Sequence, residues 1–132
     1  MEKEKKETPN PLLQVWDTPH QTPPFSTIRT EHYVPAFTAA IEMAQKETDG
    51  IAQNPETATF ANTIVALDRA GEMLGRAAGI FFNLIECDAT PEMQEMANTI
   101  QPLITDFYNN IYLNDKLFKR VQTVYKNELS TL

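Results

Sequence analysis

The sequence NPETATFANTI, residues 54–64, combines a helix stop with a helix start. Pro55 disfavours helical backbone in the residue before it, so a helix arriving from the N-terminal side should end there. Thr59 is a typical N-cap residue for the helix that follows. The stretch therefore predicts that the chain passes from one helix into a second within a few residues.

Beyond Thr59, apolar or small residues recur at steps of four and three, which places them on one face of a helix. They are Phe60, Ile64, Leu67, Gly71, Leu74, Ala78, Phe81 and Ile85. The pattern predicts one continuous helix of about 27 residues, roughly 40 Å long at ~1.5 Å per residue. Its seven-residue period favours neighbouring helices that pack at shallow angles, as in a bundle.

A helix also precedes this stretch. We expect it to begin near Thr30 or Glu31, with Thr30 as its N-cap, and to end before Pro55. Its apolar face has the same spacing of three and four residues and consists of Phe37, Ile41, Ala44, Thr48 and Ile51.

Two further helices are expected after residue 90. Thr90 and Pro91 mark the start of the third, and Pro102 should kink it or leave a gap in its hydrogen bonding. Asn114 or Asp115 caps the fourth helix. Its apolar face consists of Leu117, Val121 and Val124, with Glu128 or Leu129 at the end. Alternation typical of strands is absent, so the sequence predicts an all-α fold, a four-helix array or bundle with an extended proline-rich N-terminal arm.

The chain divides into three parts by composition. Residues 1–9 form a charged tail, residues 10–30 an extended arm, and residues 31–132 the helical domain. Five of the nine prolines lie before residue 25, and each removes a backbone donor. The arm is too apolar for a free tail, and we expect it to pack on the helical domain with Trp16 as an anchor.

Charge and cysteine content exclude several classes of protein. The formal net charge is -7, from 18 acidic and 11 basic residues, and no basic stripe suited to nucleic acid is present. Cys87 is the single cysteine, which excludes an internal disulfide and a multi-cysteine zinc site. No run approaches the roughly 20 apolar residues of a membrane span, and residues 1–7 lack the apolar segment of a signal peptide.

Gly71, Gly75 and Gly79 are spaced four apart within the predicted second helix. Each glycine costs about 1 kcal/mol relative to alanine in a helix interior, so three on one face need a reason. The favoured interpretation is a groove into which another helix or a peptide backbone packs closely. The alternatives are that tertiary contacts tolerate a weak helix, or that the glycines form a hinge.

Residues suited to catalysis are scarce. A zinc peptidase of the usual type needs H-E-x-x-H, but His20 and His32, the two histidines, are twelve residues apart and cannot form that pair. The acidic pairs Glu42/Glu47 and Glu92/Glu95 are expected on solvated helix faces. We therefore expect no catalytic residue, no metal ligand and no cofactor in this chain.

Several segments nevertheless resemble one enzyme family. They are Asn54-Pro55-Glu56, Thr59 to Leu74, Phe81-Phe82-Asn83-Leu84, Ile111-Tyr112-Leu113-Asn114, Leu117-Phe118-x-Arg120-Val121, and His32-Tyr33-x-Pro35-Ala36-Phe37. Together they are similar to the N-terminal region of bacterial peptidyl-dipeptidases (dipeptidyl carboxypeptidases), which are zinc metallopeptidases related to thimet oligopeptidase and neurolysin. Departures are modest: the family often has proline where Ala58 stands and glutamate where Ala61 stands.

The resemblance implies a role without catalysis. It implies that these helices form one wall of a substrate channel, while a C-terminal catalytic domain of the same polypeptide carries zinc and releases dipeptides from the C-terminus of short peptides. None of that domain's functional residues has a counterpart here, so this chain alone should be inactive. The alternative is a stand-alone helical interaction or dimerisation module. We also expect that a domain with an exposed apolar wall forms a homodimer or folds its proline-rich arm over the exposed surface. The compartment is left open between cytoplasm and periplasm.

Overall fold

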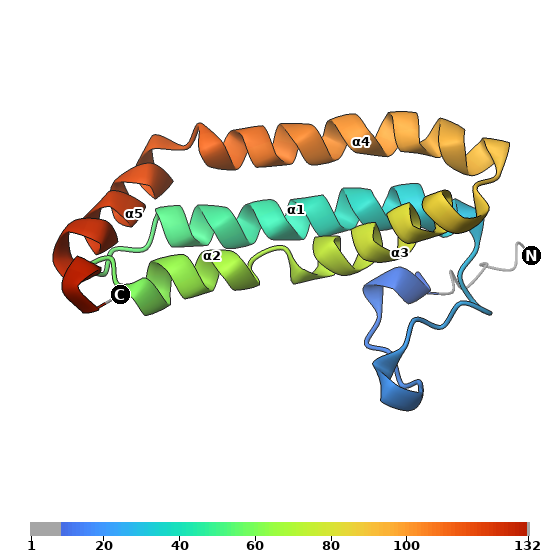
Figure 1. Ribbon diagram of the computed structural model, residues 1–132, viewed down its shortest axis with the longest axis horizontal. Helices are drawn as coiled ribbons and strands as arrows, with labels where there is room; N and C mark the ends of the chain where they lie inside the picture. Colours follow the sequence, from blue (N-terminus) through green and yellow to red (C-terminus); the bar gives the residue numbers. More distant parts are fainter. Residues whose placement is uncertain (1–8, 132) are drawn as a thin grey trace, which may run out of the picture.

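The computed structural model describes residues 9–131, and every regular element in this range is helical (Figure 1). The helices are α1 (Tyr33–Ala52), α2 (Ala66–Arg69), α3 (Glu72–Asp88), α4 (Pro91–Tyr112) and α5 (Asp115–Glu128). A π-helical turn, Phe60–Val65, precedes α2, and short 3-10 turns lie at Pro11–Leu13, Pro19–Gln21, Thr30–His32 and Leu129–Thr131. The predicted all-α fold is confirmed, whereas the predicted charged tail lies outside the described residues except for Pro9.

Helix α1 is the centre of the array. It packs against α3 on one side and α4 on the other, and Figure 1 shows it between them. Helix α5 crosses the end of the array and packs against α1 and the π-helical turn. Away from α5, the first 3-10 turn of the arm packs against both α1 and α3.

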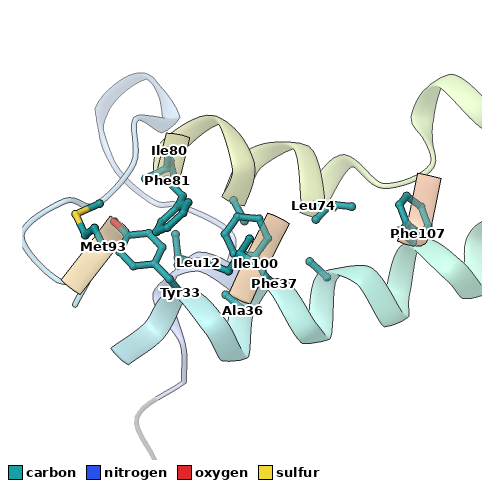
Figure 2. Close-up of a cluster of buried hydrophobic side chains, with 13 residues drawn as sticks. Leu12, Tyr33, Ala36, Phe37, Leu74, Ile80, Phe81, Met93, Ile100 and Phe107 are labelled. Atoms are coloured by element: carbon teal, nitrogen blue, oxygen red, sulfur yellow. The ribbon is translucent and has the colours of Figure 1, made fainter. Parts of the chain in front are cut away.

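One apolar core runs along α1, and Figure 2 shows part of it. The ring of Phe81 from α3 lies 5.0 Å from that of Tyr33 and 5.6 Å from that of Phe37, measured between centroids. Ile100 and Phe107 of α4 close the other side of the core. The buried residues of α1 are Tyr33, Ala36, Phe37, Ala40, Ala44 and Thr48.

The arm enters this core through Leu12, which is completely buried. Trp16, the anchor expected from the sequence, is only partly buried and packs against the edge of the core. Its indole Nε1 donates a hydrogen bond to the carbonyl oxygen of Pro11 (2.9 Å). The arm therefore has a buried aliphatic anchor and a second aromatic contact at the surface.

The start of α1 differs from the prediction. Thr30 is not an N-cap but the first residue of a 3-10 turn, and α1 begins at Tyr33. His32 is the N-cap of α1 without a side-chain capping bond, and its Nδ1 accepts the backbone N–H of Arg29, the residue before the 3-10 turn (2.8 Å). The predicted stop before Pro55 is confirmed, since α1 ends at Ala52.

The prediction of one continuous second helix is wrong. The chain is extended at Ala70 and left-handed at Gly71, where φ is 77°, so α2 and α3 are separate. The backbone N–H of Gly71 donates to Oε2 of Glu47 on α1 (2.7 Å), which fixes the break against the central helix. The break and the π-helical turn shift the buried face: Thr63 is buried, whereas Phe60 is 41% exposed.

A cluster of polar contacts joins α5 to the stretch that decides the fold. The Arg120 guanidinium donates from Nη1 to the carbonyl oxygens of Asn54 and Glu56 (both 2.9 Å) and from Nη2 to Oδ1 of Asn62 (3.0 Å). The same Asn62 oxygen accepts the backbone N–H of Thr59 (2.8 Å), while Thr59 Oγ1 accepts that of Asn62 (3.1 Å). We call this cluster the Arg120 joint.

The remaining helix caps agree with the sequence. Thr59 is the N-cap of the π-helical turn, as predicted for the second helix. Thr90 Oγ1 accepts the N–H of Met93 (3.2 Å), and Asn114 Oδ1 accepts that of Leu117 (3.0 Å). These caps satisfy first-turn donors that would otherwise have no partner inside the helix.

Helix α4 is continuous through Pro102, the proline expected to kink it or to leave a gap in its hydrogen bonding.

Replacing Asn62 with alanine should lower the free energy of unfolding by about 1–3 kcal/mol. The change removes the Asn62 acceptor from the Arg120 joint and opens the capping box, and the part-buried Arg120 Nη2 loses its partner. Urea unfolding followed by circular dichroism measures the effect. Asn127→Ala is the matched control, because Asn127 is exposed near the end of α5. Equal stability of the two variants would contradict a structural role of the joint.

Alanine should have opposite effects at two of the glycines. Gly71→Ala places a side chain at φ 77°, which costs about 1–2 kcal/mol in the left-handed region. Gly75→Ala lies inside α3, where an added Cβ meets no described atom within 4 Å, and should stabilise the chain by about 0.5–1 kcal/mol. Thermal unfolding of both variants compares them directly. A stabilising Gly71→Ala would show that the break between α2 and α3 is not fixed.

Candidate functional site: an apolar groove between the arm and α3

The three glycines singled out in the sequence have different surroundings. A Cβ at Gly71 would lie 3.5 Å from Cβ of Ala44 on α1, an ordinary van der Waals contact, and the left-handed backbone accounts for this glycine. Gly75 and Gly79 lie on an exposed face of α3, with no described atom within 4 Å of an added Cβ. Close packing against them therefore stays a prediction that concerns something other than residues 9–131.

Gly75 and Gly79 do, however, line a groove between α3 and the arm. The groove has a volume of about 390 Å³ and a mainly apolar lining. Trp16, Pro23 and Phe25 of the arm contribute to its lining from one side. On α3 the lining continues through Arg76, Ile80, Asn83 and Leu84. We call this the arm groove.

Arg76 fixes the arm beside this groove. Its guanidinium carbon lies 3.9 Å from the ring centroid of Trp16, a cation–π contact. Its Nη2 also donates to the carbonyl oxygen of Gln14 (2.9 Å). The Nε atom is buried and has no hydrogen-bond partner among the described residues. The aromatic lining of the groove thus depends on a charged residue of α3.

A second groove lies between α1 and α4. It has a volume of about 420 Å³ and is lined by apolar groups, including Ile41, Leu103 and Phe107. Charged side chains at its edge come from both helices: Glu42 and Lys46 from α1, and Asp106 from α4. Both grooves can accept apolar side chains, and neither presents a nucleophile with a neighbouring base.

Several ionisable groups of the described residues take part in local structural contacts. Within residues 9–131, no group of three His, Cys, Asp or Glu side chains is placed to hold a metal ion. Glu47 is engaged with the Gly71 N–H, and His32 with the backbone of Arg29. Burial raises the pKa of the Tyr33 phenol, which lies in the core. In the same range, no helix is long and apolar enough to cross a bilayer.

The contact that the sequence analysis missed is the one between Arg76 and Trp16. Both residues were visible, but they are 60 positions apart, and the arm has no periodicity from which its position on α3 could be inferred. The available signal was an arginine between two glycines in the middle of a mainly apolar stretch of α3. Gly75 and Gly79 correctly indicated the face of α3 that lines the arm groove, and the arm lines the groove from the other side.

The comparisons with known proteins agree with the resemblance noted in the sequence. The chain is 35% identical over 123 residues to dipeptidyl carboxypeptidase of Escherichia coli strain K12, which is 93% of this chain and 18% of that protein. It is 33% identical over 121 residues to dipeptidyl carboxypeptidase of Salmonella typhimurium strain LT2, again 18% of that protein.

Oligopeptidase A of Escherichia coli strain K12 is a further relative. It is 29% identical over 110 residues, which is 83% of this chain and 16% of that protein. No protein-family model matches the sequence. The chain spans less than a fifth of the length of the curated relatives it matches. Over nearly its whole length, it belongs to the family of the dipeptidyl carboxypeptidases and oligopeptidase A.

Proposed function

We propose that this chain is a non-catalytic helical domain of a zinc metallopeptidase that removes dipeptides from the C-terminus of oligopeptides. The observation that carries the proposal is the coverage of the match: 93% of this chain aligns with 18% of the Escherichia coli dipeptidyl carboxypeptidase. In that role the chain forms one wall of the substrate channel, and its partners are the catalytic domain of the same polypeptide and short peptides.

The residues present do not fit a zinc site of their own. The sequence has two histidines and no H-E-x-x-H, and the described residues include no group of three potential ligands. The zinc therefore belongs to a catalytic domain elsewhere in the longer polypeptide. In this proposal the contribution of the chain is steric, because a wall needs no catalytic side chain.

The exposed glycines of the arm groove suit close contact with a partner. Without a Cβ at Gly75 and Gly79, a helix or a peptide backbone can approach α3 more closely than at other positions. Trp16 and Phe25 beside them offer apolar surface to such a partner. We therefore propose that the arm groove receives a helix of the catalytic domain or the backbone of a bound peptide.

A chimera tests the proposed function. The matching region of the Escherichia coli enzyme is replaced by this chain, and dipeptide release from a blocked tetrapeptide is measured. We expect the chimera to release dipeptides, whereas the isolated chain binds no stoichiometric zinc and releases none. A chimera with Gly75→Leu should lose activity or stability, because a bulky side chain fills the arm groove, although Gly75 is unobstructed in the isolated chain.

Two results would contradict the proposal. Hydrolysis by the isolated chain would show that it carries its own catalytic residues. An inactive chimera, together with an isolated chain that is stably folded and cooperative, would show that family membership does not extend to this role. An enzyme in which the region has been deleted is the negative control for the chimera.

The alternative is a stand-alone interaction or dimerisation module. Exposed apolar residues favour association of the chain with itself or a partner. They lie on α4, on α5 and in the turn between them, and include Tyr112, Leu113, Phe118 and Tyr125. Sedimentation equilibrium of the isolated chain detects a homodimer. A stable dimer combined with an inactive chimera would favour the module, whereas an active chimera favours the peptidase domain.

A further inference from the structure

Helix α5 carries two apolar faces, and only one of them is used by the described chain. Leu117 and Val124, seven residues apart, are buried against the array. Phe118, Tyr125 and Leu129, separated by seven and four residues, are 62%, 60% and 54% exposed. At 100° per residue, Phe118 and Tyr125 lie about 20° apart around the helix axis, and Leu129 begins the 3-10 turn that follows α5. We call Phe118, Tyr125 and Leu129 the α5 stripe.

The α5 stripe is flanked by positive charge. Lys119 and Lys126 are exposed, are also seven residues apart, and lie about 100° around the helix from Phe118 and Tyr125. The helix has four basic and two acidic residues, although the whole chain has a net charge of -7. Exposed Asp115 lies on the same side, about 60° from Phe118, so this flank carries two positive charges and one negative charge. Charges beside an apolar seam help helices to select partners in coiled coils.

Two other charged groups of α5, Arg120 and Glu128, have partners within the fold. Arg120 belongs to the Arg120 joint. Glu128 accepts the backbone N–H of Phe60 on Oε2 (3.0 Å). These contacts fix the rotation of α5 about its axis, so the α5 stripe is held away from the core. The α5 stripe is exposed because the other face of α5, with Leu117 and Val124, packs on the array, and not because the helix is loosely attached.

We propose that the α5 stripe is the docking surface for an amphipathic helix that has an apolar seam flanked by acidic residues. Resting on the proposed function, the inference assigns this helix to the rest of the longer polypeptide. The relatives are long enough to contain such a helix elsewhere, because the matched region is only 18% of their chains. The spacing of seven supplies the geometry, and Lys119 and Lys126 supply the charge preference.

Two other occupants fit less well. In an antiparallel two-fold pairing of α5 with a second copy, Lys119 and Lys126 would face the same lysines of the other copy, which is repulsive. A membrane surface would require a broader apolar face than three residues interrupted by Gln122, and the net charge of -7 opposes binding to anionic lipid.

The experiment uses the chimera described above and three further variants of it. Phe118→Asp and Tyr125→Asp place a charge in the α5 stripe, and the double variant Lys119→Glu/Lys126→Glu reverses its flanking charge. Val15→Asp is the matched control, since Val15 is an apolar residue of the arm that is 89% exposed. Each substitution is also made in the isolated chain, where urea unfolding reports whether the fold is intact.

We expect the two aspartate variants to lower dipeptide release at least about tenfold, the effect of losing a central interface residue. They should also make the grafted region separable from the remainder by limited trypsin digestion, with the isolated chain's unfolding midpoint unchanged. The lysine reversal should act in the same direction and weaken with added salt. Val15→Asp should behave like the unsubstituted chimera.

The outcomes separate this inference from the proposed function. An inactive unsubstituted chimera overturns the proposed function and, with it, the assigned partner. An active chimera that tolerates all three changes overturns the inference alone. A dimer of the isolated chain that Phe118→Asp dissociates, or binding to anionic vesicles that Phe118→Asp abolishes, with no effect in the chimera, would assign the stripe to a second copy or to a membrane and also overturn it.

Discussion

The arrangement of all other elements depends on the buried face of α1. Ala36, Ala40 and Ala44 lie along it and are fully buried, and such small side chains allow neighbouring helices to approach closely. Large groups enter from both sides: Phe81 from α3 and Ile100 from α4. The arm follows the same logic, because its buried Leu12 is part of the cluster along α1. A central helix whose buried face carries several small alanine side chains thus positions the elements that form both grooves.

Part of the resemblance to the peptidyl-dipeptidases corresponds to the Arg120 joint. Asn54, Thr59, Asn62 and Arg120 all lie in segments that resemble the peptidyl-dipeptidases, and they meet in one hydrogen-bonded cluster. Their side chains bind backbone groups and each other. These residues therefore maintain the architecture, whereas Asn83 and Leu84, in another of the resembling segments, line the arm groove.

Local signals were predictable and relations between distant segments were not. The caps at Thr59, Thr90 and Asn114 were found because each depends on a side chain and the next three residues. The break at Gly71 was missed because steps of three and four continue across it, and periodicity does not detect a left-handed residue. The glycines indicated one side of the arm groove, but Trp16 and Phe25 reach it through a contact with Arg76 that no local pattern specifies.

The separation in sequence between the partners of the Arg120 joint has a consequence for how the chain acquires its structure. The contacts from Arg120 and Glu128 connect residues 58 to 68 positions apart. Closing so long a loop has an entropic cost that only the finished contacts offset. During synthesis, which proceeds from the N-terminus, α1 and α3 can pair while residues 115–128 are still being made. The π-helical turn receives its two long-range partners only after α5 emerges, so the segment that is most distinctive in sequence is among the last to become fixed.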